Sequence, residues 1–171
     1  MIFISGIHGV GKTFFCNLVK KETGIETYSA SALITQKKHA GFSKDKLISD
    51  IDSNQHYLLQ AVNELKSSGH NFILDGHFCL LDTYGAISRI PLDTFISLKP
   101  EAIVLLTEKP AVIVQRRKIR DGINIPIQSV IDFQQEECTY ANEVAEIVCA
   151  KLFISRGAED LERTIYYIKS L

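Results

Sequence analysis

Eight residues near the amino end combine glycines with a lysine and a threonine at the spacing of a phosphate-binding loop. Residues 6–13 read Gly-Ile-His-Gly-Val-Gly-Lys-Thr and match G-x-x-x-x-G-K-[ST]. Glycines let successive backbone N–H groups converge on an anion, and a helix that follows adds its amino-terminal dipole. The Lys12 ammonium then reaches the β- and γ-phosphates, and the Thr13 hydroxyl is a ligand for magnesium. The pattern therefore predicts a site for ATP and Mg²⁺.

We expect the nucleotide to contact this loop and the first helical turn after it. The predicted nucleotide-binding residues are Gly6, His8, Gly9, Val10, Gly11, Lys12, Thr13 and Phe14. The alternative is a glycine turn that merely joins a strand to a helix, and such a turn needs neither the lysine nor the threonine. The sequence assigns no particular role to the side chain of His8.

A second candidate residue ends an apolar run at residues 71–75. The carboxyl ends of parallel strands are where an open α/β sheet binds its ligands. We therefore expect Asp75 to face the magnesium ion held by Thr13, directly or through water. The alternative is a strand-end residue that caps the turn at Gly76. His77 either points at the acceptor or is a hydrogen-bonded turn residue, and the sequence leaves both possibilities open.

Three arginines, Arg116, Arg117 and Arg120, follow the fourth apolar run on a segment with helical periodicity. Arg116 and Arg120 are four residues apart and therefore share one helix face. A guanidinium pairs bidentately with phosphate, and phosphoryl transfer depends mainly on positioning and charge stabilisation. We predict Lys12, Asp75, Arg116 and Arg120 as catalytic residues. A solvated basic helix face is the alternative for the arginines, and Arg117 could replace Arg116 in facing the phosphates.

Other polar residues are candidates for binding an acceptor. Lys37 and Lys38 either reach an acceptor phosphate or complement the dipole at a helix end. Asn54, Gln55 and Asn63 either read the edge of a base through amide hydrogen bonds or are surface residues.

Composition limits the class of protein and its partners. With 171 residues and 46% hydrophobic content, the chain can bury one core, so we predict a single domain over residues 1–171. A net charge of -1 argues against broad binding to nucleic acid or an anionic membrane. The four cysteines are scattered without a C-x-x-C pair, so they indicate neither a zinc site nor a redox motif. The start of the sequence lacks a secretory pattern, and no apolar run could span a bilayer, so we expect a cytoplasmic protein.

Short apolar runs alternate with longer helical patterns, which is typical of βαβ units around a parallel sheet. The predicted strands cover residues 2–5, 25–28, 71–75, 102–107 and 151–155. The predicted helices cover residues 12–23, 29–38, 55–68, 110–120, 127–150 and 158–170. We expect residues 78–100 to be irregular apart from a short helix at 91–97.

Taken together, these motifs resemble the adenylate-kinase-like nucleoside monophosphate kinase family of P-loop NTPases, particularly its small archaeal-type members. The matching pieces are the phosphate loop, Ile73–Gly76, and the pair Arg116 and Arg120. The resemblance covers nearly the whole chain and implies a three-layer α/β/α sandwich with a five-stranded parallel sheet of order 2-3-1-4-5. It also implies an acceptor-binding region at residues 29–68 and a short lid at residues 116–126.

The chain departs from that family at the acceptor site. Where adenylate kinases have Phe-Pro-Arg after Asp-Gly, residues 77–79 are His-Phe-Cys, and Thr35 stands where the family's second helix ends in arginine. Residues 75–78 also resemble uncharacterised ATP-binding proteins of the AAA family. ATP binding is therefore better supported than AMP binding.

The expected function follows from the acceptor chemistry. A hydroxyl acceptor benefits from a carboxylate base, which residues 28–32 lack, whereas an acceptor phosphate needs none. We therefore expect a kinase that transfers the ATP γ-phosphoryl group to a nucleoside or deoxynucleoside monophosphate, a small-molecule nucleotide acceptor. The alternatives are a kinase of a hydroxyl acceptor (nucleoside, small molecule or polynucleotide 5′-hydroxyl) with Asp75 as base, and an ATP-binding regulatory module without kinase activity.

Overall fold

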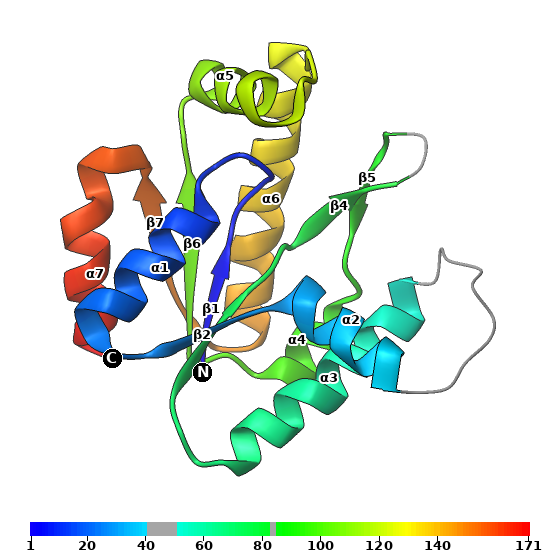
Figure 1. The fold of residues 1–171 in the computed structure, drawn as a ribbon, viewed down its shortest axis with the longest axis vertical. Helices are drawn as coiled ribbons and strands as arrows, with labels where there is room; N and C mark the ends of the chain where they lie inside the picture. The colour runs from blue at the N-terminus through cyan, green and yellow to red at the C-terminus, as the bar shows by residue number, and fades with distance from the viewer. Residues whose placement is uncertain (41–50, 83–84) are drawn as a thin grey trace.

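The centre of the molecule is a five-stranded parallel sheet (Figure 1). The computed structural model describes residues 1–40, 51–82 and 85–171. The strands of the sheet are β1 (Ile2–Ser5), β2 (Glu26–Ser29), β3 (Phe72–Asp75), β6 (Ala102–Thr107) and β7 (Lys151–Arg156). Their spatial order is β2-β3-β1-β6-β7, and every neighbouring pair is parallel. Counted alone in chain order, these five strands give 2-3-1-4-5, so the predicted sheet is confirmed.

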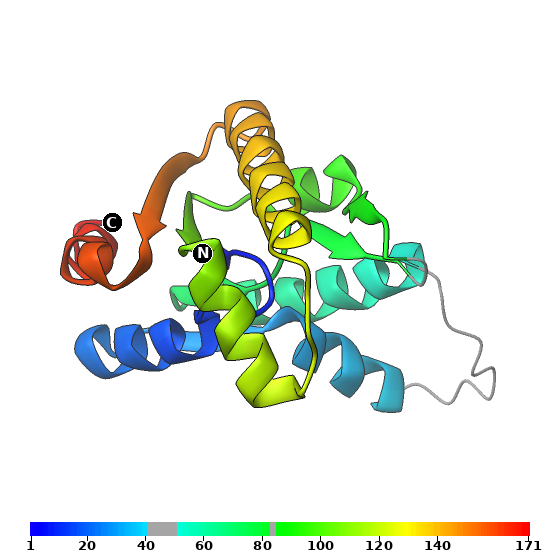
Figure 2. The same cartoon turned by 90° about the horizontal axis from the view of Figure 1, so that it is seen from above.

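Helices cover both faces of this sheet, which explains why its inner strands are uniformly apolar. Figure 2 shows α1 (Lys12–Thr23) and α6 (Ile127–Ile147) on opposite sides of the central strands. Helix α7 (Leu161–Lys169) packs beside α1, and α4 (Leu92–Leu98) packs against both α3 (Ile51–Ser67) and α6. The fully buried side chains of the inner strands include Ile4, Ile73, Ile103, Val104 and Leu105. The α/β/α class is therefore confirmed.

The predicted helices are confirmed, with shifts at their ends. The remaining helices are α2 (Ala30–Ala40) and α5 (Pro110–Asp121). Helix α6 ends at Ile147, three residues before the predicted end, because the chain turns at Cys149, whose φ is 54°. The last helix begins later than predicted because residues 157–160 form a 3-10 turn. Part of the predicted acceptor-binding region, residues 41–50, lies outside the described residues.

Two short strands form an antiparallel ribbon outside the main sheet, where the sequence predicted irregular structure. They are β4 (Cys79–Leu81) and β5 (Ile87–Arg89). Arg89 ties the ribbon to α6 through ion pairs of 2.6 Å with Glu136 and Glu143, and its guanidinium lies 4.6 Å from the centre of the Tyr140 ring. The prediction of irregular structure was wrong here because these contacts join residues about fifty positions apart. The short helix expected within this segment is confirmed as α4.

Among residues 1–40, 51–82 and 85–171, no helix combines the length and the apolar character that crossing a bilayer requires.

The burial of the cysteines predicts a pattern of chemical reactivity. Cys16 and Cys79 are buried and Cys149 is exposed. Burial raises the pKa of Cys16 and of Cys79 to about 12, so both remain protonated thiols at pH 8. We expect iodoacetamide at pH 8 to alkylate Cys149 in the native protein and to reach Cys16 and Cys79 only after unfolding in urea. Peptide mass spectrometry measures this, and rapid native labelling of Cys16 would contradict the packing of α1 against the sheet.

Candidate active site

The loop between β1 and α1 has the backbone geometry that its glycines predict. Gly11 is the N-cap of α1 and has a φ of 111°, in the left-handed region that disfavours other residues. Gly6 has a φ of 145°, and a Cβ at this position would lie 2.6 Å from the carbonyl oxygen of Leu106. Because glycine has no side chain to cap α1, the first backbone N–H groups of the helix remain free to bind an anion.

The Lys12 ammonium lies across the mouth of this loop. Its Nζ donates to the carbonyl oxygen of Gly6 at 2.6 Å and lies 3.4 Å from Nε2 of His77. Burial lowers the pKa of Lys12 from its ordinary value, while the negative charges of Asp75 and Glu137 act in the opposite direction. A partly buried cation is therefore held between the loop and the end of β3.

Asp75 is the last residue of β3, at the carboxyl end of the sheet from which the loop also starts. In the pairing of β1 with β3, Asp75 is opposite Ile4, so it lies beside the start of the loop. Its Oδ1 is buried and finds no hydrogen-bond donor within the described parts of the chain. Burial raises the pKa of Asp75, and the neighbouring Lys12 ammonium lowers it. An acceptor oxygen left without a donor beside a cleft fits a cation or a water molecule bound to a cation.

These residues fit a magnesium ion only in part. Thr13 and Asp75 line the same cleft. The described residues include no group of three or more His, Cys, Asp or Glu side chains that would hold a metal by themselves. Magnesium is commonly bound through one or two protein oxygens, with phosphate oxygens and water as the other ligands. The donor set of Thr13 and Asp75 therefore suits Mg²⁺ that arrives with a nucleotide.

His77 lies next to Lys12, and the sequence had left its role open. The rings of His8 and His77 lie 4.3 Å apart, centre to centre. Burial and then the charge of Lys12 lower the pKa of His77 to about 2, so its ring is neutral at physiological pH. Nε2 of His77 faces Lys12, and the Gly6 backbone forms a further polar contact with the ring that acts to raise the pKa of His77. Nδ1 is buried and has no partner among the described residues, which leaves one polar ring atom for a ligand.

Arg116 holds the outer wall of the loop. One guanidinium nitrogen donates to the carbonyl oxygen of Val10 at 2.8 Å, and another lies 3.1 Å from the carboxylate of Glu108. Both contacts fix the side chain beside the loop. Arg116 lines the cleft, whereas the alkyl part of Arg117 packs on Gly9, where a Cβ would lie 3.0 Å from it. The structure therefore places Arg116, rather than Arg117, in the cleft.

Arg120 also lines the cleft, one turn after Arg116. It pairs with the carboxylate of Asp121 at 2.6 Å, and its side chain is 62% exposed, so it is held less firmly than Arg116.

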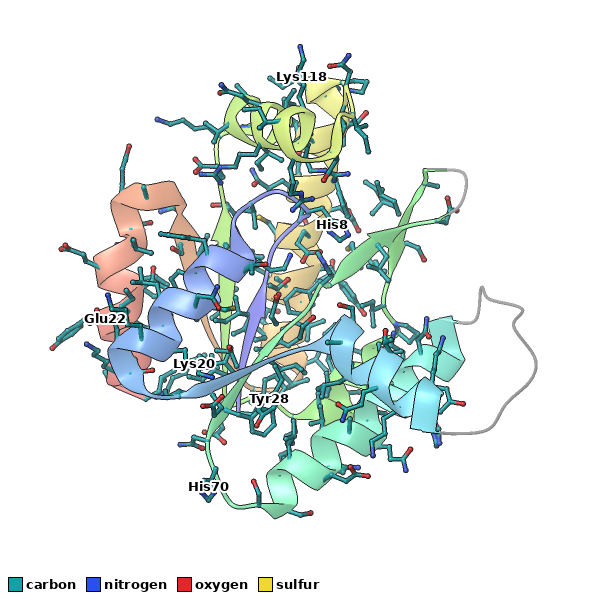
Figure 3. The ribbon with its side chains drawn as sticks, viewed as in Figure 1. His8, Lys20, Glu22, Tyr28, His70 and Lys118 are labelled. Atoms are coloured by element: carbon teal, nitrogen blue, oxygen red, sulfur yellow. The ribbon has the colours of Figure 1, made fainter. Side chains whose placement is uncertain are left out.

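Figure 3 shows His8 in the loop beneath α5, and Lys118 on the side of α5 that is remote from the loop. The predicted lid, residues 116–126, corresponds to the end of α5 and its connection to α6. That this segment acts as a lid over a bound nucleotide remains a prediction.

Sequence reasoning missed one buried acid, Glu137 on α6. Its side chain accepts hydrogen bonds from the Ser5 hydroxyl and from the backbone N–H groups of Phe78, at 3.0 Å, and Cys79, at 2.7 Å. It is 1% exposed and lies on the apolar face of the helix, four residues after Phe133. A lone acid at a core position of an amphipathic helix was the available signal.

A single cleft of about 850 Å³ joins the phosphate loop to helices α2, α3 and α4. Its phosphate end is lined by most of the predicted residues, whereas Gly6 and Val10 lie behind the wall and contribute their carbonyl groups. Its far end combines aliphatic and aromatic side chains, which are Ile34, Leu58, Leu80, Ile90, Phe95 and Leu98, with polar ones, which include Ser31, Thr35, Asn54, Gln55 and Thr94. The cleft therefore has one charged compartment at the loop and a second compartment between α2, α3 and α4 that is rich in aliphatic and aromatic side chains and is called the apolar compartment below.

The predicted acceptor residues divide into two groups. Lys38, Asn54 and Gln55 line the cleft. Lys37 instead forms an ion pair with Glu64, with Nζ 2.6 Å from both carboxylate oxygens, and Asn63 is exposed on α3. Of the lysine pair, only Lys38 is thus placed to reach an acceptor.

Comparison with solved structures identifies the class of fold. A shikimate kinase from Acinetobacter baumannii in complex with shikimate superposes with a TM-score of 0.63 at 19% identity, covering 99% of this chain and 90% of that one. An unliganded sugar kinase from Janibacter sp. HTCC2649 gives a TM-score of 0.58 at 18% identity, covering 98% and 93%. The fold is therefore that of the P-loop kinases.

Sequence comparison identifies the family. A family profile described as an AAA domain matches residues 5–129, a segment that contains the phosphate loop, Asp75 and the arginines of α5, and the chain belongs to this family. An adenylate kinase from Thermoplasma volcanium is 26% identical over 117 residues. This match covers 67% of the chain and 65% of that adenylate kinase, slightly less than two thirds of its length.

Proposed function

We propose that the protein is an ATP- and Mg²⁺-dependent phosphotransferase that transfers the γ-phosphoryl group of ATP to a nucleoside or deoxynucleoside monophosphate. The observation that carries this proposal is the single cleft that connects the Lys12 loop with the apolar compartment between α2, α3 and α4. ATP bound at the loop would direct its γ-phosphate toward an acceptor bound in the apolar compartment, because both sites open into the same cleft. Holding the two groups in line is most of what phosphoryl transfer requires from a protein.

The charged compartment would bind the donor. The N–H groups at the start of α1 and the Lys12 ammonium would hold the β- and γ-phosphates, and Arg116 and Arg120 would stabilise the charge that develops during transfer. Thr13 and Asp75 would hold Mg²⁺, which when bound neutralises phosphate charge. Nδ1 of His77 would contact the bound phosphates directly or through water.

The apolar compartment favours an acceptor that carries a flat base. Leucine, isoleucine and phenylalanine side chains form much of its wall and can pack on a flat ring, while Thr35, Gln55 and Thr94 add polar groups. Gln55 is 8% exposed, and its Oε1 has no hydrogen-bond partner in the described residues, as is also true of Oδ1 of Asn54. A primary amide both donates and accepts, so it can pair with the edge of a nucleobase. Such pairing would remove a desolvation cost of roughly 1–3 kcal/mol for the buried oxygen.

Lys38 would bind the acceptor phosphate. It lines the cleft from α2, while Lys37 is held by Glu64. A phosphate acceptor is already anionic and needs no base to activate it. In this arrangement Asp75 remains available to the metal ion.

A hydroxyl acceptor is the second candidate. It is favoured by the buried Oδ1 of Asp75, which has no protein partner in the described parts of the chain and could accept a hydroxyl proton. The named activities of the shikimate and sugar kinases that share the fold are compatible with it. His77 is an unsuitable base, because its pKa is lowered to about 2 and Nε2 faces the Lys12 ammonium.

The direct test is a panel of ribonucleoside and deoxyribonucleoside monophosphates incubated with Mg-ATP. We expect one or more of them to yield the matching diphosphate, detected by chromatography together with an equal amount of ADP. Lys12→Ala should lower the rate by about 100-fold or more, because it removes a positive charge from the migrating group.

Two other results would reject the monophosphate acceptor. Phosphorylation of nucleosides, small-molecule hydroxyls or 5′-hydroxyl oligonucleotides in its place would establish the second candidate. Tight binding of Mg-ATP without transfer to any acceptor would indicate a regulatory ATP-binding module.

The two neighbouring lysines provide a matched pair for the acceptor phosphate. Lys38→Met should raise the acceptor KM by about tenfold or more, because a hydrogen bond to a charged group contributes roughly 1.5–3 kcal/mol. The KM for ATP should stay close to its wild-type value. Lys37→Met is the control, since Lys37 faces Glu64 and not the cleft. Equal effects of the two substitutions in steady-state kinetics would remove Lys38 from the acceptor site.

A further inference from the structure

Glu137 joins the two segments that bear the charged groups of the cleft. Ser5, whose hydroxyl donates to Glu137, is the residue immediately before the phosphate loop. Phe78 and Cys79, whose N–H groups donate to the same carboxylate, directly follow His77. One side chain on α6 therefore contacts both the start of the loop and the segment after Asp75.

This contact lies where the sheet no longer holds the two segments together. The pairing of β1 with β3 ends at Ile4 and Asp75, and Gly76 adds a last backbone hydrogen bond of 2.9 Å to Ile4. Beyond this point the chains diverge, one into the phosphate loop and the other toward His77. Lys12 spans the gap by its contacts with Gly6 and His77, and Glu137 spans it from the interior.

The bridge is built for a charged carboxylate in a dry environment. Ser5, Phe78 and Cys79 are all fully buried, and such surroundings strengthen hydrogen bonds. Burial raises the pKa of Glu137, while its three donors and the Lys12 ammonium favour the ionised form. A glutamine at this position would have nearly the same shape. Its NH₂ group would face one or more of these donors, however, and the hydrogen bonds accepted there would be lost because an NH₂ group cannot accept.

We propose that Glu137 is a positioning residue for phosphoryl transfer, whose carboxylate fixes the phosphate loop relative to the segment Asp75–His77. This proposal rests on the proposed function. Glu137 is 1% exposed, so it acts through its neighbours and does not touch the nucleotide. Its loss should leave the loop able to bind ATP but should misplace Asp75 and His77 during transfer.

The test compares Glu137→Gln with Val144→Ala. Val144 is also fully buried on α6, two turns further along the helix, and it serves as a control for destabilisation without a change at the loop. At a temperature at which both variants are folded by circular dichroism, Glu137→Gln should lower kcat by about 10- to 100-fold, because small displacements of catalytic groups are costly. The KM for ATP should change by less than about threefold, and Val144→Ala should keep the wild-type kcat.

A second readout does not depend on the acceptor. In the complex with Mg-ADP, the imidazole ¹⁵N signals of His77, assigned with a His77→Gln variant, should shift or broaden in Glu137→Gln and remain in place in Val144→Ala. If the wild-type protein phosphorylates no acceptor, the proposed function fails, and the His77 signals still decide the role of Glu137.

Two outcomes would overturn the positioning role. One is a kcat and a set of His77 signals that change no more in Glu137→Gln than in Val144→Ala. If Glu137→Gln does not fold, Ser5→Ala replaces it as the test variant, because it removes one of the three donors to Glu137. Ser5→Ala should shift the His77 signals and reduce kcat by a smaller factor than Glu137→Gln. The second contradicting outcome is that the His77 signals of Ser5→Ala are unchanged.

Discussion

A lysine ammonium held between the phosphate loop and the end of β3 is the interaction on which the rest of this structure depends. Withdrawing a cation from water is unfavourable unless hydrogen bonds and opposite charges replace its hydration. Here the carbonyl oxygen of Gly6 accepts from Lys12, and Asp75 and Glu137 supply negative charge. In the proposed function, the triphosphate of a bound nucleotide would supply more. Segments at the ends of β1 and β3, together with α6, place these groups around Lys12.

The cleft divides the proposed reaction between two environments. Near Lys12 it is lined by charged and polar groups from the loop, β3 and α5, and toward α3 and α4 it combines apolar side chains with uncharged polar ones. In the proposed reaction the charged compartment would stabilise the migrating group, and the apolar compartment would select the acceptor by shape. Asn54 and Gln55 have side-chain oxygens without a partner in the described residues, and this is the feature that most favours a base in the proposed reaction.

The features that the sequence predicted correctly are those with a local pattern. The strand, glycine loop and helix around Lys12 are contiguous, and the five short apolar runs of the sheet are separated by helices, so local periodicity was enough to find them. The neighbourhood of Asp75 could be inferred because parallel strands end at the same edge of a sheet. The single-domain reading and the catalytic roles remain predictions.

The features that the sequence could not supply depend on contacts between distant residues. The β4–β5 ribbon is held by Arg89 against α6, and Glu137 reaches Ser5 across 132 positions. The contact of His8 with His77 joins two loops that are far apart in the sequence, and no sequence motif links them. The choice between Arg116 and Arg117 was open because neighbouring residues on a helix face different directions, and only the packing of α5 on the loop decides which one enters the cleft.

Isothermal titration calorimetry with Mg-ATP tests the central claim most directly, because it measures binding to the loop without any assumption about the acceptor. The account predicts saturable binding of one nucleotide per chain to the wild-type protein, and binding that is greatly weakened in Lys12→Ala. Absence of binding heat together with no increase in thermal stability would contradict it, as would equal affinities of the two proteins.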